Sequence, residues 1–110
     1  MHVLIFIKKD LNALKSKGES DPDSYSRHKK IIEAILILKQ IGENSKNVEP
    51  IEDDDYDIYL MNVDNDRILC LYVDENIFAL LHYFESDDEN ILNVLAEELI
   101  KFKEIIEKYL

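Results

Sequence analysis

Short apolar blocks separated by charged and turn-forming residues divide the first part of the chain into a strand and a short helix. Residues 2–8 form an apolar run bounded by charge, which predicts a β-strand. Residues 10–17 place Leu11 and Leu14 on one side of a short helix that ends at Gly18. Residues 19–23 contain a proline and predict a loop.

A longer amphipathic helix is predicted over residues 24–41, with Ser24 as its N-cap and Gly42 after its last residue. Its apolar face is made of side chains spaced three and four residues apart: Tyr25, His28, Ile31, Ile32, Ile35, Leu38 and Ile41. Leu36 and Ile37 widen this face, so we expect the helix to be well covered by the rest of the protein.

The second half of the chain has the pattern of strands followed by a helix. Residues 43–57 are the most polar segment and predict a loop, and residues 58–63 predict a strand. After a turn at residues 64–66, two nearly continuous apolar runs within 66–84 predict a β-hairpin whose sheet is covered on at least one face. From Asp88 onward, apolar residues recur at helical spacing and predict a final helix.

The order of predicted elements is therefore β-α-α-β-β-β-α, which indicates one α+β domain over residues 1–110. Three consecutive strands form an antiparallel meander most simply, and the first strand then joins an edge of that sheet. We expect a small antiparallel sheet packed against helices that cover one face.

Composition favours a cytoplasmic globular domain without a metal or a cofactor. Hydrophobic residues make up 46% of the chain, and no apolar run is long enough to cross a bilayer. The single cysteine, Cys70, lies within a predicted strand, which favours a buried, inert thiol over a nucleophile. His2, His28 and His82 are scattered, so a tetrahedral zinc site is not expected. The carboxylates of Glu52–Asp55 could bind a hard cation, but they lack the spacing of a calcium loop, which favours a solvated acidic loop.

The net charge of −11 is unevenly distributed along the chain. Residues 1–46 carry nine basic and six acidic side chains, whereas residues 47–110 carry four and eighteen. A nucleic-acid-binding surface needs clustered cations, because phosphate contacts supply most of the affinity. Such a surface would have to come from cations early in the chain: Lys8, Lys9, Lys15, Lys17, Arg27, Lys29 and Lys30. The acidic majority otherwise indicates a solubilising surface.

Three sequence features together resemble the RelE/ParE-like toxin superfamily, and within it the phage-type HigB toxins of bacterial toxin–antitoxin pairs. They are the strand DRILCLYV at residues 66–73, the strand FALLHYF at residues 78–84, and the acidic residues that lead into the final helix. The resemblance extends from Phe6 through that helix. It implies a RelE-like fold, cleavage of mRNA on the ribosome by basic residues of the concave sheet, and a cognate antitoxin that blocks this surface.

The resemblance also assigns individual positions. The arginine that ends the family's first meander strand falls on Asn62, whereas the arginine of the next strand is kept as Arg67. The histidine of the LLHxF motif is kept as His82, and Glu85-Ser86-Asp87-Asp88 replaces the usual lysine pair. The implied site has Arg67 and His82 as catalytic residues, with RNA-binding positions at Lys8, Lys9, Asn62 and Tyr83.

Cleavage of RNA by its own 2′-hydroxyl requires proton transfer and a cation that stabilises the phosphorane. Arg67 could hold the phosphate with its planar guanidinium, and His82 or Tyr83 could transfer protons. Strand alternation places His82 and Tyr83 on opposite faces, so only one of them can point at a substrate. Structural roles are the alternatives: Arg67 could pair with an acidic neighbour, and His82 could be a partly buried structural histidine.

Three functions follow as hypotheses. The first is the toxin of a type II pair, a ribosome-dependent mRNA endonuclease that an antitoxin neutralises. The second is a RelE-fold protein without nuclease activity that binds a protein partner, and the acidic composition favours a basic protein partner over RNA. The third is a mimic of nucleic acid that places Glu52–Asp55 in a basic groove. A fold alone does not carry an activity, so the choice depends on the geometry of the site.

Overall fold

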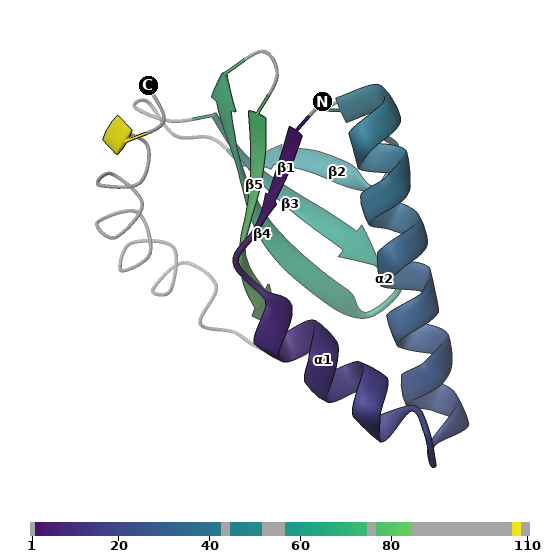
Figure 1. The fold of residues 1–110 in the computed structure, drawn as a ribbon. Coiled ribbons are helices and arrows are strands. Elements are labelled where there is room, and N and C mark those ends of the chain that lie inside the picture. The colour runs from purple at the N-terminus through teal and green to yellow at the C-terminus, as the bar shows by residue number, and fades with distance from the viewer. Residues whose placement is uncertain (1, 43–44, 52–56, 75–76, 85–106, 109–110) are drawn as a thin grey trace.

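The computed structural model describes residues 2–42, 45–51, 57–74, 77–84 and 107–108 (Figure 1). Within them the elements follow in the order β1 (His2–Ile5), α1 (Lys8–Lys17), α2 (Pro22–Ile41), β2 (Val48–Ile51), β3 (Asp57–Val63), β4 (Asp66–Asp74) and β5 (Ile77–Phe84). The α+β class is confirmed. The final helix predicted from Asp88 and the acidic stretch Glu52–Asp55 lie outside the described residues.

The five strands form one sheet in the order β1-β5-β4-β3-β2. β3, β4 and β5 are the expected antiparallel meander, and β1 joins its edge beside β5, as predicted. The sheet is mixed and not purely antiparallel, because β1 runs parallel to β5. A parallel pair needs a long crossover, and here the crossover consists of α1, α2 and the rest of the meander.

The opposite edge of the sheet is a strand that the sequence pattern did not predict. β2 lies within residues 43–57, which were expected to form a loop, and it pairs antiparallel with β3. Its four residues include Pro50, which has no backbone N–H to donate. Proline is tolerated at a sheet edge because the missing donor can face away from the neighbouring strand.

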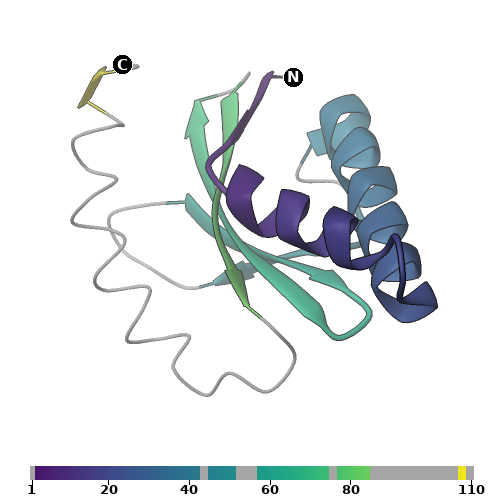
Figure 2. The same ribbon diagram turned by 60° about the horizontal axis from the view of Figure 1, so that its bottom comes forward.

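Both helices cover the same face of the sheet (Figure 2). The core between the helices and the sheet, here named the helical-face cluster, consists of Ile7, Leu11, Leu14, Ile31, Ala34, Ile35, Leu38, Met61, Val63, Ile68, Cys70, Phe78 and Leu80. Phe78 is fully buried at its centre, with the rings of Tyr59 and Tyr72 at 5.6 and 5.9 Å between centroids.

The other face of the sheet is also apolar and buried. Its residues, here named the second-face cluster, are Ile58, Leu69, Leu71, Ala79, Leu81 and Phe84. They alternate with residues of the helical-face cluster along β3, β4 and β5, as a sheet buried on both faces requires. Leu69 has no exposed surface and Leu71 only 2%.

The start of α2 differs from the prediction. Ser24 is not the N-cap: the helix begins two residues earlier at Pro22, and Asp21 is the capping residue, whose carboxylate accepts a hydrogen bond from the backbone N–H of Asp23. Ser24 is instead buried in the first turn and donates its hydroxyl to Asp21 Oδ2 at 2.6 Å. Proline fits this first helical turn because the N–H that it lacks would have no partner there. Gly42 ends the helix with φ of 60°, as the pattern predicted.

The expectation that α2 is well covered is wrong. Ile31, Ile35 and Leu38 are buried, but Tyr25 is 62% exposed and Leu36 is 52% exposed. Ile37 and Ile41 are exposed as well. Residues 31–38 are apolar around most of the helix circumference, yet the described part of the protein buries only one side of them. None of the described helices is both long and apolar enough to cross a membrane.

Candidate functional site

Three of the residues that the resemblance singled out lie on one face of the sheet. Arg67 pairs with Asn62 on β3 and with Phe84 on β5, and His82 pairs with Leu69 on β4. The alternation of β4 places Arg67 on the same face as Leu69 and Leu71, which belong to the second-face cluster. Asn62, Arg67 and His82 therefore share the face that the two helices do not cover.

These three side chains differ in how accessible they are. Arg67 is exposed, and its guanidinium makes no ion pair within the described residues. Asn62 is half-buried and donates a hydrogen bond to Glu49 Oε1 at 3.0 Å. His82 is half-buried, with its ring centroid 4.6 Å from that of Phe84. The rest of this face is buried and apolar, so it is not the open cationic surface that the resemblance implies.

Tyr83 points to the helical face, so it is separated from His82 as predicted. Its hydroxyl donates to Asp66 Oδ1 at 2.5 Å and accepts from Arg27 Nη2 at 2.8 Å. Arg27 also binds both carboxylate oxygens of Asp66, through Nε at 3.1 Å and Nη2 at 2.8 Å. These three residues, named here the Arg27 cluster, join α2 to β4 and β5.

Burial and hydrogen bonding determine the charge states within the Arg27 cluster. Burial opposes ionisation of Asp66, but the hydrogen bonds from Arg27 and Tyr83 outweigh it and hold the pKa of the carboxyl below its ordinary value of 3.8. Burial, together with the neighbouring Asp66 carboxylate, raises the pKa of the Tyr83 hydroxyl. The Tyr83 hydroxyl therefore stays protonated at neutral pH and gives up its proton less readily than an ordinary tyrosine, and its two partners occupy it. The cluster is a structural connection, and the assignment of Tyr83 to RNA binding is not supported by its position.

The early cations lie on the helices and not on the sheet. Lys8 and Lys9 are exposed in the first turn of α1. Lys30 binds Asp64 at 2.7 Å in an exposed ion pair. A polar cavity of about 290 Å³ adjoins this pair and the Arg27 cluster, but carboxylates already engage both of its bases. The cations of this cavity therefore have little capacity left for an anionic ligand.

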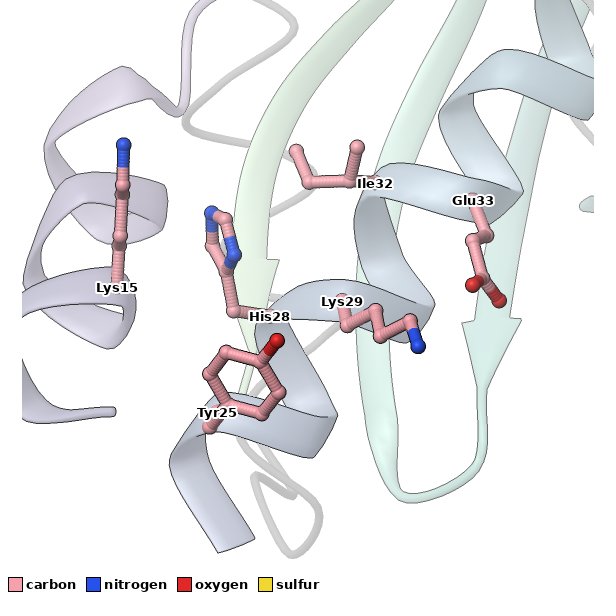
Figure 3. A pocket seen from close by; sticks show the side chains of 6 residues that line it. All are labelled: Lys15, Tyr25, His28, Lys29, Ile32 and Glu33. Carbon is pink, nitrogen blue, oxygen red and sulfur yellow. The ribbon is translucent and has the colours of Figure 1, made fainter. Parts of the chain in front are cut away.

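A larger cavity of about 380 Å³ opens between the two helices (Figure 3). It is lined by Lys15 from α1 and by Tyr25, His28, Lys29, Ile32 and Glu33 from α2. Its wall is mainly apolar, because Tyr25, His28 and Ile32 contribute rings and an aliphatic chain. The amino groups of Lys15 and Lys29 belong to exposed side chains. We name this cavity and its lining the interhelical groove.

The two helices meet closely at one end of this groove. A Cβ atom added to Gly18 would lie 2.9 Å from the backbone of Tyr25, closer than real Cβ atoms approach. Gly18 itself has a helical φ of −64°, so space and not backbone conformation favours glycine at this position. This close approach fixes α1 against α2, and the groove is largely formed before any ligand binds.

The single cysteine and the question of a metal site can be addressed in the described residues. Cys70 is fully buried on the helical face, and burial raises the pKa of its thiol, as expected for an inert cysteine. Among the described residues, no three His, Cys, Asp or Glu side chains gather in a way that could hold a metal ion. The interhelical groove offers binding of an apolar group beside the amino groups of Lys15 and Lys29.

Comparison with protein-family models and with curated proteins gives no match to this chain. The resemblance to RelE-like toxins is therefore carried by the residues quoted above.

Proposed function

We propose that the protein acts by binding a protein partner through the layer formed by α1 and α2, and not by catalysis on the sheet. The observation that carries this proposal is the exposed apolar surface of α2. Leu36, Ile37 and Ile41 are 52%, 37% and 48% exposed within six residues of one helix. Single exposed apolar residues are ordinary, but a helical stretch that is apolar on most sides, as residues 31–38 are, is normally buried.

Exposed apolar residues that lie together on a polar background are typical of protein-binding surfaces. Of these, Leu36 continues the line of the interhelical groove, since Tyr25, Ile32 and Leu36 are spaced seven and four residues apart on α2. Ile37 and Ile41 are four residues apart and share a neighbouring side of the same helix. The two helices carry eight basic and three acidic side chains, which form the polar background. Aliphatic side chains beside lysines suit a protein surface better than a sugar–phosphate chain, because RNA has few aliphatic groups to bury.

A photo-crosslinking residue placed at the position of Leu36 is expected to form a protein adduct of defined mass in cells. The same residue placed at Glu49, which is exposed on β2 at the edge of the sheet, is the matched control and is expected to give none. The variant Tyr25→Ser, made in the chain that carries the crosslinking residue at position 36, should reduce the yield of adduct about tenfold. A single aromatic side chain often contributes this much to the affinity of a protein interface. Equal adducts from positions 36 and 49, or adducts with RNA only, would contradict the proposal.

A second proposal is that the chain is the cytoplasmic toxin of a type II pair, a ribosome-dependent mRNA endonuclease with a RelE-like fold and a cognate antitoxin. It is supported by Asn62, Arg67 and His82 sharing one sheet face, with Arg67 exposed. In this function Arg67 binds the scissile phosphate and His82 transfers a proton. Lys8 and Lys9 would contact the RNA backbone, whereas Tyr83 is engaged by the Arg27 cluster.

If the second proposal holds, Arg67→Ala is expected to lower mRNA cleavage by about 100-fold or more, because it removes the cation that stabilises the transition state. Growth and newly formed mRNA 5′ ends, measured after induction in a bacterial host, give the readout. Lys46→Ala removes an exposed cation elsewhere and serves as the control. Normal growth and intact mRNA with folded wild-type protein would reject this function while leaving the first proposal untouched.

A further inference from the structure

The interhelical groove has the dimensions and charge to select one kind of partner. Building on the proposed binding function, we infer that the partner segment is an acidic amphipathic helix. It lies along α2 and inserts one large apolar side chain between Lys15 and Lys29. Four features of the described residues carry this inference: the charge of the helical layer, the size of the cavity, the spacing along α2, and the nature of the exposed backbone.

The helical layer is positive in a protein that is otherwise acidic. Of the eight basic residues on α1 and α2, Arg27 and Lys30 are bound by Asp66 and Asp64. The same layer also carries Lys8, Lys9, Lys15, Lys17, Lys29 and Lys39, against Asp10, Asp23 and Glu33. The whole chain has a net charge of −11, so this layer is a local exception to its field. A partner guided by charge to this surface must itself be acidic.

The cavity has room for one large apolar side chain of a partner. Its volume of about 380 Å³ lies at the lower end of the range for binding pockets, and its wall of Tyr25, His28 and Ile32 is largely apolar. A leucine or an aromatic side chain would bury apolar surface there, while carboxylates on either side could reach Lys15 and Lys29. Such an arrangement, an apolar anchor with charges at the border, is typical of an amphipathic helix held in a groove.

The spacing along α2 sets the length of the partner. Tyr25 and Leu36 are eleven residues apart, which corresponds to about 16 Å of helix. Three turns of a partner helix span this distance and present anchors at i, i+3 or i+4, and i+7. Strand addition is not available here, because the surface is helical and the backbone groups of α1 and α2 are hydrogen-bonded within each helix.

Two other occupants fit the surface less well. RNA would meet the same lysines, but it would leave the aliphatic side chains of Ile32 and Leu36 without apolar contacts. A second copy of the chain would bring its own net charge of −11 and another lysine-rich layer into the interface. Like charges brought together in this way oppose association.

The inference can be tested with designed peptides of about 20 residues, long enough for a stable helix across the groove. The acidic probe carries leucines at i, i+4, i+7 and i+11 and glutamates at its other polar positions. The basic probe has the same leucines with lysines in place of the glutamates. A pyrimidine-rich RNA of about a dozen nucleotides is the third probe. Fluorescence anisotropy reports the Kd of each for the full chain, and sedimentation reports self-association.

The acidic peptide is expected to bind at least about tenfold more tightly than the basic one, with a Kd that rises with salt. The double variant Lys15→Glu, Lys29→Glu should remove this preference. Lys46→Glu, an exposed charge reversal outside both helices, should leave it unchanged. Leu36→Ser should weaken binding of the acidic peptide through lost apolar contact.

The other outcomes separate this inference from the proposed function. In one outcome both peptides bind equally, Leu36→Ser weakens this binding, and the charge reversals leave it unchanged. This outcome would overturn the acidic partner but keep protein binding on this layer. If only RNA binds, the occupant of this surface is RNA and the inference of an acidic helix is wrong. If the chain self-associates and Leu36→Ser abolishes this, the occupant is a second copy of the chain and the inference is again wrong. Binding of no probe, together with no crosslink from position 36, would reject both the inference and the function.

Discussion

Asp66→Asn is expected to lower the free energy of unfolding by about 2–3 kcal/mol at neutral pH, measured by urea denaturation. The Asp66 side chain is only 4% exposed, and it accepts hydrogen bonds from Arg27 and Tyr83. Asparagine keeps the shape but removes the charge, so the guanidinium of Arg27 loses its counter-ion. Arg27 is 27% exposed and can regain some hydration, which keeps the loss below that of a fully buried pair.

The same variant should change how stability depends on pH. The pKa of the folded Asp66 carboxyl lies below its ordinary value of 3.8, so the unfolded chain binds its proton more readily. The stabilisation by Asp66 is therefore fully present above pH 3.8 and is lost as the pH falls through the folded pKa. We expect the stability difference between wild type and Asp66→Asn to narrow below pH 3.8. A difference that stays constant in this range would contradict an ionised, hydrogen-bonded Asp66.

Asp64→Asn is the matched control, because it removes a carboxylate two residues away in the same turn. Asp64 and Lys30 form an ion pair at 2.7 Å, but their side chains are 65% and 53% exposed. Exposed pairs contribute about 0–1 kcal/mol. Asparagine also tolerates the φ of 54° that Asp64 adopts. If Asp64→Asn cost as much as Asp66→Asn, the effect would belong to the turn and not to the Arg27 cluster.

The Arg27 cluster also marks the limit of what the sequence could predict. Arg27 was counted among the surface cations, yet its partners are 39 and 56 residues away in the chain. Contacts of that separation depend on how β4 and β5 are placed against α2, which no local pattern encodes. One signal was available: Arg27 falls on the same side of the helix as the buried Ser24 and Ile31, where a cation needs a carboxylate.

Elements with strong periodicity were predicted well, and those that depend on a neighbour were not. The β4–β5 hairpin and the strand β3 follow from apolar runs bounded by turn residues. β2 was missed because four residues that include Pro50 become a strand only through pairing with β3. The coverage of α2 was misjudged for a related reason. A sequence shows that Leu36 and Ile37 are apolar, but not whether an element of the same chain covers them.

Among the site residues, the prediction that His82 and Tyr83 face opposite sides followed from strand alternation alone and is confirmed. The interhelical groove could not be predicted in the same way. Its lining joins Lys15 of α1 to residues of α2, and the angle between two helices is set by packing at Gly18 and in the core. One feature of the sequence nevertheless indicated an apolar line on α2, since Tyr25, Ile32 and Leu36 share one side of the helix.

Leu69→Ala is expected to lower the free energy of unfolding by about 2–4 kcal/mol, the usual cost of deleting a buried leucine side chain. Leu69 belongs to the second-face cluster and has no exposed surface. Leu36→Ala is the matched control: Leu36 is 52% exposed, so its loss should change stability by no more than about 0.5 kcal/mol. Chemical denaturation of both variants gives the comparison.

This pair of variants also bears on the choice between the two proposed functions. Leu69 lies directly across from His82 in the β4–β5 pairing, so a nucleic acid that reaches His82 along the sheet would have to lie close to Leu69. A large loss of stability in Leu69→Ala with none in Leu36→Ala would mean that the sheet face is a closed core and the helical layer is the available surface. A small loss in Leu69→Ala would mean that the face around Arg67 and His82 opens readily in solution. The mRNA endonuclease would then become the stronger of the two proposals.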